Sequence, residues 1–285
     1  MRTIDSRKWL LYSLSPSQLA AGDDRRIHHG INKARDAITA KSGCKEGAGI
    51  LDNDYKAAFD YTVLHWVFKV LRDKGLNQDV IHRMANLYRN NLTVVVVNNI
   101  PGISVKNIMI PLRQGDLPSM HLVSFGIDPI LGYLEKRLQG ILITSLPVLG
   151  PVCAGQPPLG SLEECFKVIG YADDVKPAIT SMEEFTVVDR AMHLFETSSG
   201  CRLHRDTASK KCKFIPLARW KVTLQQTDIP CNYMTISDHL DMLGVELRST
   251  WVQTRKVNGE EVQSRVESTT KQWRSGKFMH LLSRS

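Results

Sequence analysis

Two adjacent aspartates between two apolar segments constrain this chain more than any other feature. Asp173 and Asp174 lie between the apolar segments 166–170 and 175–179. The flanks predict two strands, so we expect residues 171–174 (the acid turn) to project both carboxylates from the tip of a β-turn. Two like charges held this close repel each other, and divalent metal binding is the usual offset because hard cations prefer carboxylate oxygens. The sequence therefore predicts a metal site at a hairpin turn.

A second acidic cluster lies upstream, in the segment Ile50–Asp60. Residues 48–54 have the pattern of a short buried strand that ends in acids. If Asp54 and Asp173 converge, they can hold two metal ions around a transferring phosphate, which is nucleotidyl-transfer chemistry. Taken alone, Asp54 is more simply interpreted as the N-cap of a helix.

The bulk composition is that of a basic globular protein. The chain has 285 residues, enough for one large domain or two modest ones. Its formal net charge of +8 suits a polyanionic partner, although many basic proteins bind no nucleic acid. The six cysteines form no C-x-x-C pair, so we expect reduced thiols in an intracellular compartment and neither a zinc site nor a disulfide framework. No apolar run has the length of a signal-peptide core or a membrane span, so no membrane partner is expected.

Hydrophobic periodicity predicts an α+β chain. Apolar residues recur at helical spacing in the segments 25–40, 63–76, 79–91, 118–138 and 181–198. Asp79 is expected to cap the third of these helices. Strand patterns occupy 48–54, 93–99, 213–216 and 241–246, besides the two flanks of the acid turn. Pro101 and Gly102 predict a turn, residues 146–160 predict a loop rich in proline and glycine, and the basic tail after Trp251 is predicted to be helical.

Five short motifs follow one another in an order that is more specific than any of them alone. They are Asp-Tyr-Lys-Ala-Ala-Phe-Asp at 54–60, Arg-Gln-Gly-Asp-Leu-Pro-Ser-Met at 113–120, Tyr-Ala-Asp-Asp at 171–174, Ser-Gly-Cys-Arg-Leu-His at 199–204 with a lysine pair at 210–211, and Leu-Gly-Val at 243–245. Over roughly residues 20–250 the chain resembles the reverse transcriptases of non-LTR (LINE-type) retrotransposons. Group II intron reverse transcriptases are more distant kin.

The resemblance implies a right-hand polymerase palm, an antiparallel sheet with helices packed behind it. On that basis we expect residues 1–47 to be partial fingers, 48–248 the palm with the catalytic motifs, and 249–285 the start of a thumb or connector. The fingers of this family begin well upstream of the first matched segment. We therefore expect a fragment of a larger polyprotein, whose other domains are partners.

The resemblance also assigns the acidic residues. Asp54 and Asp173 match the metal-binding aspartates of the family, and Asp174 matches the neighbouring acid that completes the site. The expected cofactors are two Mg²⁺ ions, with Mn²⁺ able to replace them. The family spacing from the first aspartate to an Ala-Phe pair fits Ala58 and Phe59 from Asp54 and does not fit them from Asp52. Phe59 would then crowd the sugar 2′-carbon and exclude ribonucleotides, unless it is only a core residue; both readings can hold.

Nucleotide and template contacts are implied for the second motif. Gly115 would let the backbone approach the template-paired nucleotide, Gln114 would contact the nucleotide or template, and Arg113 would support the loop or the phosphates. The family usually continues with Pro-Leu-Ser, whereas this chain has Leu-Pro-Ser at 117–119, which moves a fixed φ by one residue.

The last two motifs imply a proton donor and a primer contact. Lys210 or its neighbour Lys211 would protonate the departing pyrophosphate, with a basic surface loop as the alternative. Leu243 and Gly244 would form the primer grip, with an ordinary hairpin glycine as the alternative.

The function implied is an RNA-directed DNA polymerase that extends a DNA primer with dNTPs on an RNA template, acting in the cytoplasm and nucleus. Two alternatives stay open: a truncated, catalytically inactive copy that retains only nucleic-acid binding, and a truncated reading frame whose product has no stable function. The intact Asp54, Asp173 and Asp174 favour the polymerase, while the short fingers favour the alternatives.

Overall fold

The protein has a mixed α+β fold. The computed structural model describes residues 13–20, 27–42, 44–88, 92–98, 100–106, 112, 117–144, 163–206, 208–242, 244–248 and 251–274. The helices there are α2 (Ile27–Lys41), α3 (Ala58–Tyr61), α4 (Leu64–Asp73), α5 (Gln78–Leu87), α6 (Leu117–Arg137), α7 (Glu183–Ser199), α8 (Trp220–Thr223), α9 (Trp251–Arg274) and the 3₁₀ turn η1 (Gln226–Asp228). The strands are β1 (Gly47–Asp52), β2 (Tyr55–Lys56), β3 (Leu92–Val97), β4 (Ile100–Lys106), β5 (Ile141–Thr144), β6 (Glu163–Phe166), β7 (Val168–Tyr171), β8 (Asp174–Ile179), β9 (Arg202–Leu203), β10 (Lys213–Ala218), β11 (Thr235–Ile236), β12 (His239–Met242) and β13 (Val245–Arg248).

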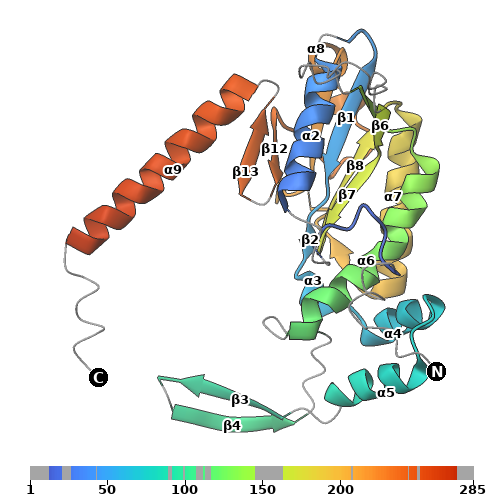
Figure 1. Cartoon of the computed structure of the whole chain (residues 1–285), viewed down its shortest axis with the longest axis vertical. Coiled ribbons are helices and arrows are strands. Elements are labelled where there is room, and N and C mark those ends of the chain that lie inside the picture. The colour runs from blue at the N-terminus through green and yellow to red at the C-terminus, as the bar shows by residue number, and fades with distance from the viewer. Residues whose placement is uncertain are drawn as a thin grey trace, which may run out of the picture.

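A five-stranded sheet forms the centre of the molecule (Figure 1). Its strand order is β11-β10-β1-β8-β7, and every neighbouring pair is antiparallel except β10 with β11. In β1 and β8 only the first residue of each strand escapes burial. Strands covered on both faces carry nearly continuous apolar runs, which is why these two were visible in the sequence.

The two faces of the sheet bury different clusters of side chains. Leu51, Val175 and Phe214 belong to the larger core, which also includes residues of α6 and α7. Ile50 and Ala178 point to the opposite face and pack in a cluster with residues of α2 and the β12–β13 hairpin. Figure 1 shows α6 and α7 to one side of the sheet and α2 with β12 and β13 to the other.

The register of β1 against β8 places the acidic residues. Gly49 pairs with Ile179, and an antiparallel bridge joins Asn53 to Val175. Continuing this register sets Asp52 across from Lys176 and the residue after Asn53 across from Asp174. These side chains alternate onto the face that carries α2 and the β12–β13 hairpin, beyond the end of the apolar cluster.

The cap of one helix and the position of one turn differ from the prediction. The helix predicted at 79–91 begins at Gln78, and its N-cap is Asn77, whose Oδ1 accepts from the Asp79 N–H at 2.7 Å. Asparagine caps as well as aspartate, and an acid in the first turn still suits the helix dipole. The turn predicted at Pro101 and Gly102 lies earlier in the chain, because both residues belong to β4 and Val97 pairs with Ile100.

Several other segments test the predictions made from the sequence. The β5–β6 hairpin was not predicted, and the single strand expected at 241–246 is instead parts of two strands, β12 and β13, joined by a turn. The tail after residue 250 forms the long helix α9, as expected. The loop predicted at 146–160 lies outside the described residues. Within the described residues, no helix combines the length and the apolar character that crossing a membrane requires.

Candidate active site

The acid turn forms as predicted, at the tip of the β7–β8 hairpin. Tyr171 pairs with Asp174, so Ala172 and Asp173 are the two residues of the turn. Ala172 is buried and has a φ of 52°, in the left-handed region that residues other than glycine rarely adopt. Asp173 is half-buried. The strained residue therefore lies immediately before the predicted metal ligand, as functional turns often show.

Asp54 follows the end of β1 and lies beside this turn. The preceding residue Asn53 is fully buried and donates to the Val175 carbonyl through its backbone N–H, at 3.3 Å, and its side-chain Nδ2, at 3.4 Å. These bonds fix the chain at the point where β1 ends. The Asp54 side chain is 44% exposed, so its carboxylate is open to solvent and to a bound ion.

The negative charge of Asp54 affects the pKa of Asp173. The pKa of Asp173 is raised above its ordinary value, first by burial and then by the negative charge of Asp54. Among the described residues Asp173 forms no ion pair that would neutralise it. The register of β1 against β8 thus places Asp54 and Asp173 at adjacent strand ends. Two half-open carboxylates without a buried counter-ion are a donor set that suits Mg²⁺ or Mn²⁺.

Lys176 is buried between two other carboxylates of the same face. It is 3% exposed, and its Nζ lies 2.5 Å from Asp52 Oδ1 and 2.7 Å from Asp174 Oδ1. Burial raises the pKa of Asp52, and it raises that of Asp174 to about 6 despite the attraction of Lys176. Burial alone would lower the pKa of Lys176, but the two carboxylates outweigh it and raise the pKa instead.

This pairing separates the two acids of the turn. Asp174 has one carboxylate oxygen committed to Lys176, so at most the other is free for a metal ion. Asp52, which the family spacing rejected as a ligand, is buried and accepts from the same lysine through its Oδ1. The geometry is consistent with choosing Asp54 rather than Asp52.

The segment after α7 brings two basic side chains to Asp54. The His204 backbone N–H donates to the Asp54 carbonyl at 3.0 Å, and His204 Nε2 lies 3.7 Å from Asp54 Oδ2. Lys211 Nζ lies 4.0 Å from the same oxygen. Lys210, the other lysine expected as a possible proton donor, is exposed, has a φ of 50°, and forms no ion pair with a described residue. Of the two lysines, Lys211 is the one near the carboxylates.

Arg205 anchors this segment to the body of the protein. Its guanidinium lies 2.9 Å from Glu196 Oε2 and 2.8 Å from Asp189 Oδ1, both on α7. Tyr233 donates to the same Asp189 oxygen at 2.8 Å. Because Arg205 directly follows His204, the network fixes where the imidazole meets Asp54.

The remaining residues of the first motif lie in the short helix α3. Ala58 is buried, and Phe59 is half-buried and packs against the larger core. Ala57, just before them, has a φ of 39°. The backbone thus turns sharply between the carboxylate of Asp54 and the aromatic ring. Phe59 contacts the core with one part of its ring and leaves another part accessible.

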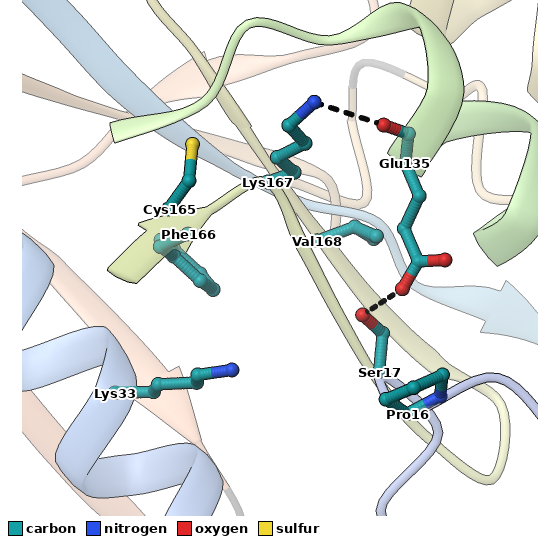
Figure 2. Close-up of a pocket in the computed structure, with 8 residues that line it drawn as sticks. All are labelled: Pro16, Ser17, Lys33, Glu135, Cys165, Phe166, Lys167 and Val168. Carbon is teal, nitrogen blue, oxygen red and sulfur yellow. Dashed lines mark hydrogen bonds between the residues drawn. The ribbon is translucent and has the colours of Figure 1, made fainter. Parts of the chain in front are cut away.

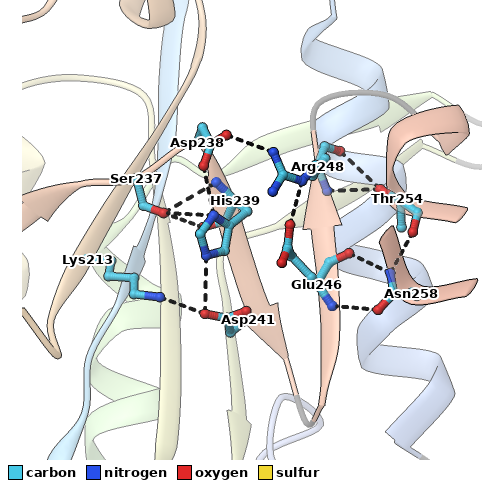
Figure 3. Close-up of polar contacts among 9 residues, drawn as sticks. All are labelled: Lys213, Ser237, Asp238, His239, Asp241, Glu246, Arg248, Thr254 and Asn258. Atoms are coloured by element: carbon cyan, nitrogen blue, oxygen red, sulfur yellow. Dashed lines mark hydrogen bonds and ion pairs between the residues drawn. The ribbon is translucent and has the colours of Figure 1, made fainter. Parts of the chain in front are cut away.

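The predicted primer-grip turn joins β12 to β13. Met242 pairs with Val245, and Gly244 has a φ of 82° with open space around its Cα. Figure 3 shows how polar contacts fix the hairpin: Lys213 of β10 pairs with Asp241 of β12, and Asn258 and Thr254 of α9 bond to β13. Leu243, Arg113, Gln114 and Gly115 lie outside the described residues.

One group beside this hairpin has the composition of a metal site. His239, Asp241 and Glu246 place ligand atoms within 4.8 Å of one another. Asp241 is already paired with Lys213 at 2.6 Å, and Glu246 is paired with Arg248. Their charge is neutralised by these close cations, whereas Asp54 has only the longer contacts to His204 and Lys211 and Asp173 forms no ion pair with a described residue.

Sequence reasoning missed Lys176, His204 and a buried glutamine, Gln18. Lys176 carried a signal, since it alternates with Asp174 on one strand as Asp52 alternates with Asp54 on another. The pairing of these four residues depends on the register between strands more than 100 residues apart in the chain, which periodicity does not give. His204 lay inside a recognised motif without an assigned role.

Comparison with known proteins places the fold. No protein-family model and no curated protein matches this sequence. Several solved structures do match, and two of them have a TM-score of 0.52. Apo telomerase from Candida tropicalis, truncated from its C-terminal domain, matches over 86% of this chain and 43% of its own at 10% identity. Telomerase from Candida albicans, in complex with a TWJ fragment of telomeric RNA, matches over 85% and 36% at 12% identity.

These matches bear on the fold class. Telomerase is a reverse transcriptase-related polymerase, so the chain has a reverse transcriptase-like α+β fold with a mostly antiparallel central sheet. It spans less than half the length of either telomerase chain.

Proposed function

We propose that this chain is the RNA-directed DNA polymerase (reverse transcriptase) domain of a non-LTR retrotransposon. The observation that carries the proposal is the convergence of Asp54 and Asp173, at the ends of neighbouring strands, in a reverse transcriptase-like fold. The ordered motifs supply the finer assignment to the non-LTR class. In this reading the central sheet is the palm, α2 belongs to partial fingers, and α9 begins the thumb or connector.

Asp54 and Asp173 would hold two Mg²⁺ ions, with Asp174 offering the oxygen that Lys176 leaves free. When bound, the metal ions would activate the primer 3′-hydroxyl and would neutralise charge on the leaving pyrophosphate. The chain itself keeps the two carboxylates apart from Lys176, so that their charge is available to the ions. It also fixes their separation through the Asn53–Val175 bridge.

The other motif residues would handle the substrates. Phe59, following the buried Ala58, would exclude ribonucleotides by a clash at the sugar 2′-carbon. Arg113, Gln114 and Gly115 would contact the nucleotide and template, and Leu243 with Gly244 would hold the primer. Lys211 lies closer to the carboxylates than the alternative Lys210 and would deliver a proton to the departing pyrophosphate.

The partners implied are an RNA template, a DNA primer, dNTPs and further domains of a longer polyprotein, encountered in the cytoplasm and nucleus. The rival function is a catalytically inactive copy that retains nucleic-acid binding. Salt dependence does not separate the two, because both predict phosphate contacts. Metal-dependent synthesis does, because a passive binder does not need Mg²⁺.

The test is primer extension on poly(rA)/oligo(dT) with dTTP, with and without Mg²⁺. Asp173→Ala should abolish extension while leaving duplex affinity largely intact, because Asp173 is assigned to the metal. Asp60→Ala is the matched control, since Asp60 is an exposed aspartate in the adjacent helix α3. A folded wild-type chain that binds the duplex without extending it would establish the inactive copy. Equal loss of duplex binding and synthesis in Asp173→Ala would contradict the metal assignment.

A further inference from the structure

The backbone of Ala172 presents a problem that the acid turn must solve. Its φ of 52° is unfavourable for a residue with a Cβ, and the residue is 5% exposed. A buried peptide needs partners for its N–H and C=O groups, and a two-residue turn offers few within the hairpin. Any rearrangement of Ala172 would also move Asp173, the next residue.

Gln18 supplies those partners from a distant part of the chain. Its Oε1 accepts from the Ala172 N–H at 3.2 Å, and its Nε2 lies 3.5 Å from the Ala172 carbonyl oxygen. The Gln18 side chain is fully buried. One amide side chain therefore contacts both polar groups of the strained residue, as a neighbouring strand would.

The segment that carries Gln18 runs as a short extension of the sheet. The Gly170 N–H donates to the Ser17 carbonyl at 2.8 Å, and the Leu19 N–H donates to the Gly170 carbonyl at 2.7 Å. Gln18 thereby forms a parallel bridge with Gly170 beside β7. The amide is held against the turn by backbone pairing on both sides of it.

Helix α6 fixes the segment from the other side. Figure 2 shows Ser17 Oγ donating to the carboxylate of Glu135, and Ser15 Oγ donates to the same oxygen at 2.8 Å. The Ser15 N–H donates to Asp128 Oδ1 at 2.6 Å, and Asp128 pairs with Lys74 of the chain after α4. Gln18 is thus mounted on a rigid frame that includes α6, at the opposite edge of the sheet from β11.

We infer that Gln18 is a positioning residue of the polymerase site: its buried amide holds Ala172 in the left-handed conformation and thereby sets Asp173 against Asp54. This inference rests on the proposed function, because it gives Gln18 a role in the metal site proposed there. Outer-shell partners of metal ligands commonly change metal affinity or activity by about 10- to 100-fold when they are removed. Gln18 acts one residue away from the ligand, through the backbone.

The test compares Gln18→Met, which keeps the length of the side chain and removes the two contacts with Ala172 together with the bond from the Ala20 N–H, with Gln226→Met. Gln226 is an exposed glutamine at the other edge of the sheet that also bonds to the backbone: its Nε2 donates to the Met234 carbonyl at 2.7 Å, and its Oε1 accepts from the Ile236 N–H at 2.8 Å. Mn²⁺ affinity is measured by electron paramagnetic resonance without nucleic acid, and the rate constant and nucleotide affinity of single-nucleotide extension are measured separately. Gln18→Met should weaken Mn²⁺ binding and lower the rate constant by about tenfold or more. Gln226→Met should change neither.

A second pair of variants tests the route through Ala172. In an Ala172→Gly background the left-handed conformation costs little, so Gln18→Met should have a smaller effect on Mn²⁺ affinity than in the wild type. Equal effects in both backgrounds would overturn the inference. So would a Gln18→Met variant that melts at a lower temperature but, while folded, binds Mn²⁺ and extends the primer as the wild type does.

The proposed function can fail separately. In one outcome, the wild-type chain binds Mn²⁺ through Asp173, Gln18→Met binds it more weakly, and neither extends a primer. That outcome would contradict the polymerase function and support the positioning role of Gln18. A wild-type chain that binds no Mn²⁺ would overturn both.

Discussion

The acidic face of the sheet contains two pairs of carboxylates that the protein treats in opposite ways. Asp52 and Asp174 share the buried ammonium of Lys176, at 2.5 and 2.7 Å. Asp54 and Asp173 are more open, and the negative charge of Asp54 raises the pKa of Asp173 with no buried cation between them. The first pair has a buried counter-ion in the fold, whereas the second has only the half-exposed or exposed side chains of His204 and Lys211 beside Asp54.

The contrast shows how a fold can gather four acids and still leave a metal site usable. Four uncompensated carboxylates at one end of a sheet would oppose folding. Lys176 neutralises the pair that lies deeper, so that only the outer pair depends on metal ions. An acid that is paired with a buried lysine is a poor ligand, which also explains why neighbouring aspartates need not be equivalent.

The largest expected effect separates Asp54 from Asp52. Asp54→Asn should reduce primer extension by about a thousandfold, roughly 4 kcal/mol of transition-state stabilisation, because it removes a metal ligand. Asp52→Asn should reduce it by less than about tenfold, since its carboxylate serves Lys176. Single-turnover extension rates at saturating Mg²⁺ check both. Equal losses in the two variants would erase the distinction between the pairs.

For the stability of the fold, the inner pair around Lys176 should matter more than the outer pair. Lys176→Met should destabilise the fold by about 3–5 kcal/mol, because it leaves two buried carboxylates without a counter-ion. Lys213→Met is the control: it breaks the more exposed pair with Asp241 on the same face and should cost less than about 1 kcal/mol. Urea unfolding measures both free energies. A small effect of Lys176→Met would mean that solvent already screens the inner pair.

The choice between ribonucleotides and deoxyribonucleotides should depend on Phe59, whose replacement leaves both pairs of carboxylates unchanged. Phe59→Ala should improve incorporation of UTP relative to dTTP by about tenfold, since the clash with the 2′-hydroxyl is a repulsive term in specificity. Phe68→Ala, another half-buried ring that packs against the same core, controls for lost packing. Competition assays with UTP and dTTP give the ratio. Unchanged discrimination would make Phe59 a core residue only.

The smallest expected effect is a pH dependence of stability in the metal-free protein. The pKa of Asp174 is raised from 3.8 to about 6, so the folded chain binds this proton more tightly than the unfolded chain. The associated stability is fully present below pH 3.8 and is lost as the pH rises through about 6. In Asp174→Asn this contribution is absent, so the free energy of unfolding should change by roughly 1–2 kcal/mol less between about pH 4 and 7 than it does in the wild type. Thermal melts of both proteins across this range give the difference. Parallel curves would show that Asp174 keeps its ordinary pKa.

Much of the fold was accessible from the sequence because its central strands are continuous apolar runs. β1, the β7–β8 hairpin and helix α7 all lie within two residues of their predicted limits or closer. Gly200 ends α7 with a φ of 79°, as a glycine after a periodic segment indicates. The β5–β6 hairpin escaped because short strands of a separate two-stranded sheet lack a long pattern.

The site was accessible in part, for a related reason. Its acids were visible as local clusters, and the family spacing selected Asp54 over Asp52. The cation that distinguishes the two pairs could not be predicted from the sequence, because Lys176 contacts Asp52 only through the register of β1 against β8. Gln18 was invisible for the same reason, since its partner Ala172 is 154 residues away. Contacts between distant segments decide such roles, and local patterns do not encode them.

Mn²⁺ binding to the nucleic-acid-free protein tests the central claim most directly. Electron paramagnetic resonance titrations would compare the wild type with Asp54→Asn, Asp173→Asn and Asp52→Asn. The account predicts Mn²⁺ binding that is lost in Asp54→Asn and in Asp173→Asn and is retained in Asp52→Asn. Binding that survives the loss of Asp54 and Asp173, or that disappears only with Asp52, would contradict it.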